Sequence, residues 1–197
     1  VMTCNEVKEI LKYLYKLRAD NPDTGGYAYK AQTRDIAVVE LLFATGIRVS
    51  ELCELSCDAV DLKQATIKVF GKGSKERVIQ ICSVEVLKIL RQYQRLFAPS
   101  KCFFINRLGN RLSSQSVRLL IKRCREEIGI GKKITPHTFR HTFATLLLEE
   151  DVDIKYIQNL LGHSSITTTQ IYTHVNMNKQ KKILSSKHPR KKMEMEE

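Results

Sequence analysis

The segment Thr135–Leu147 constrains the fold most, because a strong helix start is followed by one apolar stripe. Thr135 can cap a helix with its hydroxyl, and Pro136 suits the first helical position, where a missing N–H costs nothing. The stripe with helical spacing consists of Phe139, Phe143, Leu146 and Leu147. We therefore expect a helix from Pro136 to about Glu150 that buries one face.

Two polar side chains near the start of this helix lie off the apolar stripe. His137 and Arg140 are three residues apart and close to the expected helix N-terminus. Backbone N–H groups and the helix dipole favour an anion at such a terminus. The pattern therefore predicts an anion site, and phosphate is the natural candidate.

The periodicity of the remaining chain predicts mainly helices and one small antiparallel sheet. The other helices are expected at Val7–Arg18, Ala31–Thr45, Ser50–Leu55, Ser83–Phe97, Ser114–Ile128, Ile154–Leu161 and Ser165–Tyr172. Two alternating segments, Ala65–Phe70 and Lys75–Ile81, flank a glycine-rich turn and predict a hairpin. Cys102–Ile105 is expected to form a short strand. Beyond Asn178 the chain is basic and poor in apolar residues, so we expect an extended or loosely helical tail.

The charge balance points to a polyanionic partner. Lys and Arg outnumber Asp and Glu by 33 to 21, and the basic residues are spread over many elements, which favours a broad cradle. No apolar run is long enough for a membrane span, and no secretory signal is present. The six cysteines form no C-x-x-C pair and predict reduced thiols in a cytoplasmic chain. Because the sequence begins at Val1, we interpret it as part of a longer protein.

Several other residues are chemical candidates, each with an ordinary explanation. Lys72 lies between two glycines at the hairpin tip, although lysine is common in exposed turns. Arg48 precedes Glu51 by three residues, a spacing that a simple ion pair explains equally well. The histidines at 137, 141 and 163 suggest a metal site, but Thr138 stands where a zinc-protease motif needs glutamate, and Arg140 would add a cation beside the metal. We therefore expect no metal.

Taken together, these residues resemble the catalytic domain of tyrosine recombinases, the phage-integrase family that includes the Xer-type resolvases. The resemblance runs from about Ala31 to Val175 and rests on TGIRVSEL, GKGSKER, HTFRHTFAT, LLGHSS and YTHV, in this order and spacing. It implies an α+β, mainly α fold with a small antiparallel sheet. Residues 1–178 would form the catalytic domain, and 179–197 a basic tail that docks on a neighbouring protomer. The family's usual N-terminal DNA-binding domain would precede Val1.

The resemblance also implies an activity. It is site-specific DNA cleavage and religation through a 3′-phosphotyrosine, without metal or cofactor, for integration, excision or resolution of a DNA element. The implied partners are double-stranded DNA and other protomers, monomeric when free and tetrameric in the synapse. By position, the roles are Arg48 and Arg140 as phosphate clamps, Lys72 as general acid, His137 as acid–base, His163 as hydrogen-bond donor, Tyr172 as nucleophile and Glu51 as support. DNA contacts are expected from Lys75, Arg77, Arg118, Lys122, Arg123, Lys132 and Lys133.

Two alternative functions fit part of the same pattern. A type IB topoisomerase shares the chemistry but would relax supercoils as a monomer without synapsis. A DNA-binding domain without activity would form no covalent adduct, and the intact set of six candidate residues argues against it.

Overall fold

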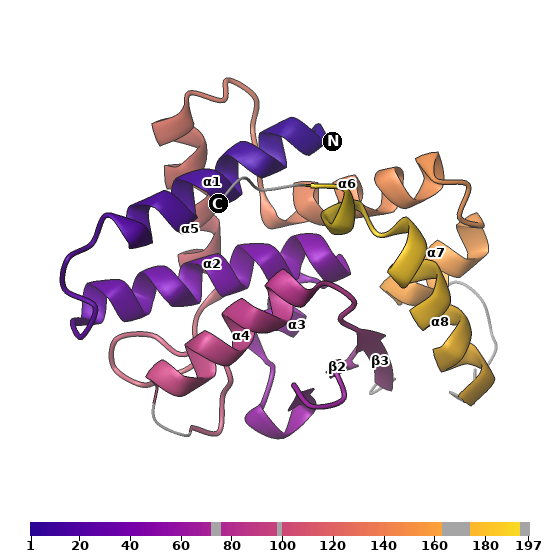
Figure 1. Cartoon of the computed structure of the whole chain (residues 1–197), viewed down its shortest axis with the longest axis horizontal. Coiled ribbons are helices and arrows are strands. Elements are labelled where there is room, and N and C mark those ends of the chain that lie inside the picture. Colours follow the sequence, from indigo (N-terminus) through magenta and orange to yellow (C-terminus); the bar gives the residue numbers. More distant parts are fainter. Residues whose placement is uncertain (72–75, 98–99, 163–173, 194–197) are drawn as a thin grey trace.

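Helix α2 (Tyr27–Thr45) lies near the centre of the fold, and several other helices pack against it (Figure 1). Every residue from Ile36 to Thr45 is buried, as expected for a helix that is apolar on nearly all sides. Helices α1 (Cys4–Ala19), α4 (Val84–Leu96) and α6 (Pro136–Glu149) contact it from different sides. α2 therefore fixes the relative positions of elements that are far apart in the sequence.

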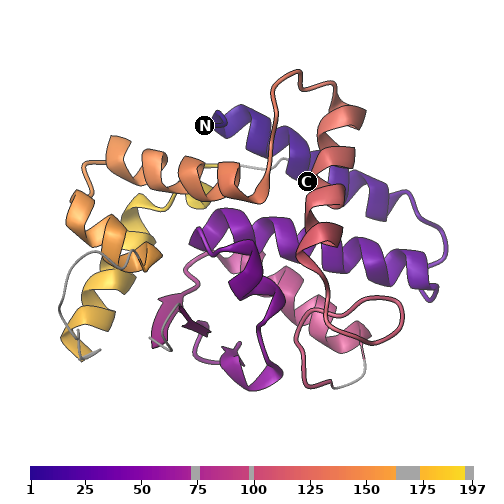
Figure 2. The same ribbon diagram turned by 180° about the vertical axis from the view of Figure 1, so that it is seen from behind.

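This computed structural model describes residues 1–71, 76–97, 100–162 and 174–193. The remaining elements are α3 (Val49–Cys53), η1 (Cys57–Ala59), β1 (Val60–Asp61), β2 (Thr66–Phe70), β3 (Glu76–Gln80), α5 (Ser114–Ile128), α7 (Ile154–Leu161), α8 (His174–Lys187) and η2 (Pro189–Lys192). Figure 2 shows α5 running across α1, which it contacts. The predicted α+β, mainly α architecture is confirmed. Among the helices described, none is long and apolar enough to cross a membrane.

The sheet is small and antiparallel, with strand order β1-β2-β3. β1 pairs with β2 through Val60 and Ile67. β2 pairs with β3 through Val69 and Arg77, which confirms the two strands of the predicted hairpin. The predicted strand at Cys102–Ile105 is wrong. Only isolated bridges form there, from Ser56 to Cys102 and from Ile105 to Arg111, because the segment pairs with two different partners.

Some helix starts also differ from the prediction. α1 begins at Cys4, before the expected Val7. α2 begins at Tyr27, before the expected Ala31, after a turn in which the Asp23 carboxylate accepts the Gly26 N–H at 3.0 Å. α3 begins at Val49, because the Glu51 carboxylate accepts the backbone N–H of Arg48 and Arg48 becomes the N-cap. The expected helix at 165–172 lies outside the described residues.

The described apolar residues form two clusters of unequal size. The larger one fills the space between α1, α2, α4, α5 and the sheet. The smaller one joins α6, α7 and α8 and consists of Phe143, Leu147, Val152, Ile157, Leu160, Leu161 and Leu184. Gly46 ends α2 where the clusters meet. Its φ is +60°, and a Cβ there would lie 2.6 Å from both Leu161 and Phe143, so only glycine fits without displacement.

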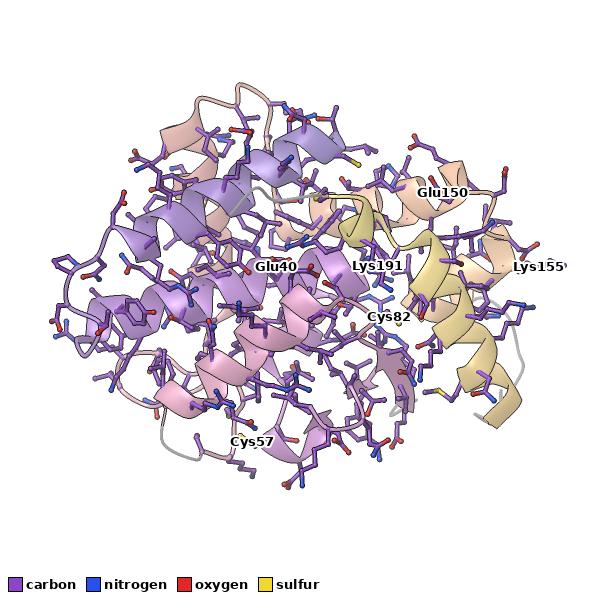
Figure 3. All side chains as sticks on the ribbon, in the orientation of Figure 1. Glu40, Cys57, Cys82, Glu150, Lys155 and Lys191 are labelled. Carbon is purple, nitrogen blue, oxygen red and sulfur yellow. The ribbon has the colours of Figure 1, made fainter. Side chains whose placement is uncertain are left out.

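The C-terminal segment is ordered, which corrects the expectation of an extended or loosely helical tail. Leu184 of α8 is fully buried in the smaller cluster. The Arg190 guanidinium donates to both oxygens of the buried Glu40 carboxylate at 2.8 and 2.9 Å, and His188 Nε2 lies 2.6 Å from the Ala44 carbonyl oxygen. Figure 3 shows Glu40 on α2 beneath the η2 turn that carries Lys191. In this structure residues 174–193 thus pack on their own chain, and docking on a neighbour stays a prediction.

Candidate active site

Arg48 is the first candidate that the fold positions firmly. As the N-cap of α3 it donates from its backbone N–H to Glu51 Oε2 and from Nη1 to Glu51 Oε1, both at 2.9 Å. Its Nη2 donates to the Gly162 carbonyl at 3.2 Å. The side chain is nevertheless 38% exposed. Arg48 is therefore oriented by the protein and still accessible from solvent.

Glu51 is a buried carboxylate surrounded by donors. Besides Arg48, it accepts two parallel hydrogen bonds from Arg77, from Nη1 to Oε1 and from Nη2 to Oε2, each 2.8 Å long. Burial alone would raise the pKa of Glu51, but the hydrogen bonds and charge of Arg77, with those of Arg48, outweigh it and lower the pKa to about 2. Glu51 is therefore ionised at neutral pH, and the predicted supporting position is occupied by a fixed negative charge.

Arg77 lies in a different setting from the exposed DNA contact that the sequence suggested. Its side chain is 6% exposed and faces inward from β3. Besides the two bonds to Glu51, its Nε donates to the Leu160 carbonyl at 3.2 Å. The alternation of β3 contains the signal that reveals this position, because Arg77 shares a face with the buried Ile79.

Arg140 is held by backbone carbonyls at the C-terminal ends of two helices. Nη1 donates to the carbonyl of Gly46, the C-cap of α2, and Nη2 to the carbonyl of Leu161, the last residue of α7, both at 2.7 Å. Such carbonyls carry the negative end of the helix dipole. Burial, followed by the charges of Arg48 and Arg77, lowers the pKa of Arg140 to about 10, so the guanidinium remains charged at neutral pH.

These contacts converge on the end of α7. Three consecutive carbonyls, at Leu160, Leu161 and Gly162, accept from Arg77, Arg140 and Arg48 respectively. Three cations from three different elements thus surround one carboxylate, which leaves a net positive charge in the cluster. Such a cluster favours an anion with several oxygens, and phosphate has the geometry that guanidinium groups bind.

His137 lies on the same helix as Arg140. The predicted N-terminus is confirmed: the Thr135 hydroxyl accepts the N–H of Thr138 at 3.3 Å, and Pro136 occupies the first turn. His137 is exposed in that turn, three residues before Arg140. The imidazole is therefore free of the apolar stripe, as the sequence predicted.

Four candidates lie outside the described residues: Lys72, Lys75, His163 and Tyr172. His163 directly follows Gly162 in the sequence, and Tyr172 stands two residues before the start of α8. Their roles stay predictions.

Five expected DNA contacts that the structure describes lie outside the cluster, and they are exposed on α5 and the loop that follows it. They are Arg118, Lys122, Arg123, Lys132 and Lys133. Three of them pair with carboxylates, since Lys122 lies 3.9 Å from Glu126, Arg123 lies 3.6 Å from Asp35, and Lys132 lies 2.6 Å from Glu6. Contact with DNA stays a prediction for this surface.

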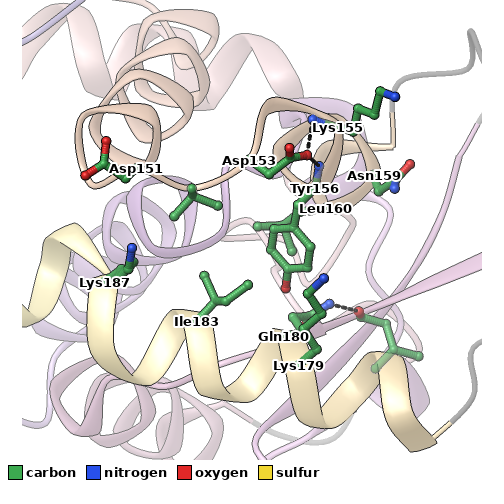
Figure 4. A pocket seen from close by; sticks show the side chains of 12 residues that line it. Asp151, Asp153, Lys155, Tyr156, Asn159, Leu160, Lys179, Gln180, Ile183 and Lys187 are labelled. Carbon is green, nitrogen blue, oxygen red and sulfur yellow. Dashed lines mark hydrogen bonds between the residues drawn. The ribbon is translucent and has the colours of Figure 1, made fainter.

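A cavity of about 350 Å³ lies between α7, α8 and β3 (Figure 4). Tyr156, Ile183 and Lys179 are among the residues that line it, and the Tyr156 hydroxyl points toward α8. Within the described part of the chain, none of the candidate catalytic residues lines this cavity. The arginine cluster, and not the cavity, is therefore the candidate active site.

Comparison with known proteins identifies the family of the chain. The phage integrase family matches residues 1–179. A tyrosine recombinase of Agathobacter rectalis is 51% identical over 94% of this chain and 61% of its own length, and the tyrosine recombinase XerC of Thermodesulfovibrio yellowstonii is 45% identical over 79% of this chain and 55% of its own length. The chain thus spans little more than half the length of these relatives.

Solved structures give the same result for the fold. The crystal structure of XerA recombinase superposes with a TM-score of 0.69 at 32% identity, and the match covers 93% of this chain and 63% of that one. XerH site-specific recombinase, in a pre-cleavage complex with its difH substrate, superposes with a TM-score of 0.70 at 23% identity over 83% of this chain and 47% of that one.

Proposed function

Because this chain belongs to the phage integrase family, we propose that it is the catalytic part of a site-specific DNA recombinase that cleaves and religates DNA. The observation that carries the proposal is the arginine cluster. Arg48 and Arg140 are held by backbone carbonyls and by Glu51, and their charges lie close enough to perturb each other. A phosphodiester is the anion that such a pair would clamp.

The proposed reaction needs these cations. When phosphorus becomes pentavalent, its non-bridging oxygens gain charge, and preorganised guanidinium groups stabilise that charge without reorganisation at the moment of reaction. Arginines placed in this way are worth ~10³–10⁵ in rate in other phosphoryl transfers. Arg48 and Arg140 would take this part, and His137, beside Arg140 on α6, would take part in proton transfer.

Tyr172 would be the nucleophile. Its hydroxyl gives up a proton, with His137 as the proposed base, and its oxygen attacks phosphorus. A 3′-phosphotyrosine forms, the bond to the 5′ oxygen of the DNA breaks, and that oxygen leaves with a proton supplied by Lys72. Ionising a tyrosine of pKa ~10 at pH 7 costs about 4 kcal/mol, at ~1.36 kcal/mol for each pH unit, which neighbouring cations offset. His163 would donate a hydrogen bond to the phosphate. Because the ester conserves the bond energy, a second 5′-hydroxyl can reverse the reaction, and neither metal nor cofactor is required.

The proposed partners are double-stranded DNA and further protomers. XerH binds its difH substrate in the pre-cleavage complex, which supports DNA as the partner of this chain. We propose a free monomer, a tetramer in the synapse and a cytoplasmic location, where the six free cysteines would remain reduced. The recombination would integrate, excise or resolve a DNA element.

The tail is proposed to exchange between protomers. Its anchors here are Leu184, His188 and Arg190, and they occupy a socket formed by α2, α6 and α7. An identical socket exists on every protomer, so the same contacts can form with a neighbour. Removing the residues after Asn178 should impair recombination between two sites more than single-site cleavage, which should lose only what the missing Leu184 and Arg190 contacts cost in stability. An equal effect on both reactions would contradict exchange.

The proposed function is tested with a nicked suicide duplex of the chain's own site. After incubation, a denaturing gel should show a covalent protein–DNA band that survives EDTA and disappears in Tyr172→Phe. A band that persists in this variant would exclude Tyr172. Loss of cleavage in EDTA that a divalent ion restores would support metal chemistry. Relaxation of supercoils without pairing of two sites would favour the topoisomerase alternative.

A further inference from the structure

We propose that Arg77 is a positioning residue that keeps Arg48 available to the scissile phosphate by occupying the Glu51 carboxylate from the buried side. The proposal deepens the function above and rests on it. The family resemblance gives Arg77 no catalytic role, and the sequence suggested a DNA contact. The structure assigns it a buried place at the junction of β3, α3 and α7.

The cost of burying Arg77 indicates that its contacts matter. β3 places its side chain on the inward face with Ile79, where an apolar residue would ordinarily be found. Each of its three nitrogens has an acceptor: Nη1 and Nη2 bind the two oxygens of Glu51, and Nε binds the Leu160 carbonyl. The two parallel bonds are the strongest geometry that guanidinium and carboxylate can form.

The division of Glu51 between two arginines is the central observation. Arg77 uses both oxygens, whereas the Arg48 side chain binds only Oε1, through Nη1. Arg48 is 38% exposed, whereas Arg77 is 6% exposed. The buried arginine thus takes the bidentate position, and the accessible arginine is oriented by a single bond to the carboxylate and one to the Gly162 carbonyl.

Removal of Arg77 would change this division. The buried Glu51 carboxylate would lose the two hydrogen bonds from Arg77 and would keep Arg48, at the start of the same helix, as its hydrogen-bonded cation. The Arg48 guanidinium could then form a bidentate pair with the two Glu51 oxygens. Such a pair would draw the Arg48 guanidinium inward and away from the phosphate. A displacement of about 1 Å at a reacting group can cost roughly 100-fold in rate. We expect a cleavage rate lower by this order in Arg77→Met.

The test compares Arg77→Met with Arg34→Met, which removes another largely buried arginine, paired with Asp35 at 2.8 Å on α2. Both should lose stability, but only Arg77→Met should slow single-turnover cleavage at saturating DNA. In Arg77→Met the cleavage rate should fall far more than DNA affinity, because affinity is shared by many phosphate contacts whereas the rate depends on the position of Arg48 at the reacting phosphate. Cleavage at the wild-type rate, or a fall in affinity as large as the fall in rate, would overturn the proposal.

A double variant separates positioning from simple loss of structure. Glu51→Gln combined with Arg77→Met removes both charges of the buried pair, while Arg48 and Arg140 keep their bonds to the Gly162, Gly46 and Leu161 carbonyls. It should cleave roughly tenfold faster than Arg77→Met, because no carboxylate competes for Arg48. An equally slow double variant would show that Arg77 acts through packing alone.

Two measurements keep the test decisive when a variant or the assay fails. If Arg77→Met does not fold, Arg77→Lys keeps the charge but loses the paired bonds, and wild-type cleavage by it would overturn the proposal. Carbon-13 NMR of the Glu51 carboxyl needs no cleavage: its pKa should be near 2 in the wild type and clearly raised in Arg77→Lys. If the wild type forms no adduct although the Glu51 pKa is near 2 and rises in Arg77→Lys, the proposed function fails and the pairing of Arg77 with Glu51 stands. An unchanged pKa would reject the pairing itself.

Discussion

Replacing Arg190 by methionine should leave Glu40 as a buried carboxylate without its cation. The pair is almost inaccessible, with Arg190 2% and Glu40 0% exposed, and Arg190 supplies two hydrogen bonds to the carboxylate. Breaking a buried ion pair by removing one partner costs ~3–5 kcal/mol. The Tyr15 hydroxyl still donates to Glu40 at 3.0 Å, so we expect the lower end, about 3 kcal/mol.

This loss should be visible as a change in the free energy of unfolding. Chemical denaturation followed by circular dichroism gives the value directly, and a domain of this size should melt roughly 6–12 °C lower, at ~2–4 °C for each kcal/mol. Glu40→Gln combined with Arg190→Met should be close to the wild type, since both charges are removed together. Lys16→Met, which removes an exposed ion pair with Asp20, should leave the free energy of unfolding nearly unchanged.

A destabilisation below about 1 kcal/mol for Arg190→Met would refute this reasoning. It would mean that residue 190 does not sit on Glu40 in solution. The difference in stability between the wild type and Arg190→Met should not depend on protein concentration. If it disappeared when both proteins were diluted, the tail would be held by a second protomer, because only an intermolecular contact depends on concentration.

Three further outcomes follow from other parts of the structure. Burial, together with the charge of Arg190, lowers the pKa of His188 to about 4. The folded protein therefore disfavours the charged imidazole, and stability should fall by up to roughly 3 kcal/mol as the pH drops from the ordinary pKa of 6.5 to 4. The fall should be smaller in His188→Asn. Gly46→Ala places a Cβ against Leu161 at positive φ and displaces the carbonyl that binds the second clamp arginine, so denaturation should show a loss of at least ~1 kcal/mol and adduct formation should slow; wild-type values for both would contradict this. Lys72→Ala should be slow on normal DNA and largely rescued when sulfur replaces the bridging 5′ oxygen, because a thiolate of pKa ~8.5 leaves without a proton; equal slowness on both substrates would make Lys72 a phosphate contact.

The local signals in the sequence predicted most helices well. Caps act within four residues, so Thr135 could be identified as a helix start without knowledge of the fold, and the structure shows its hydroxyl accepting a backbone N–H. Four other helices have the same kind of cap, at Thr3, Ser83, Ser113 and Asp153. The strand expected at 102–105 was wrong because pairing depends on partners distant in the chain.

The parts that sequence reasoning missed depend on tertiary contacts. A basic residue reads as exposed until its partner is known, and Arg77 and Arg190 are both buried against glutamates that lie 26 and 150 residues away. The backbone acceptors at residues 160–162 have no sequence signature at all, because every residue has a carbonyl. Alternation in β3 was the one available sign that Arg77 points inward.

The most direct measurement of the central claim is the identity of the residue that carries DNA. The protein is incubated with a suicide duplex of its own site, the adduct is digested with protease and nuclease, and the modified peptide is sequenced by mass spectrometry. We predict that a 3′-nucleotide is attached to Tyr172, and that Arg48→Ala and Arg140→Ala reduce its yield strongly. Attachment to any of the other six tyrosines, or the absence of an adduct from a folded wild-type protein, would contradict the account.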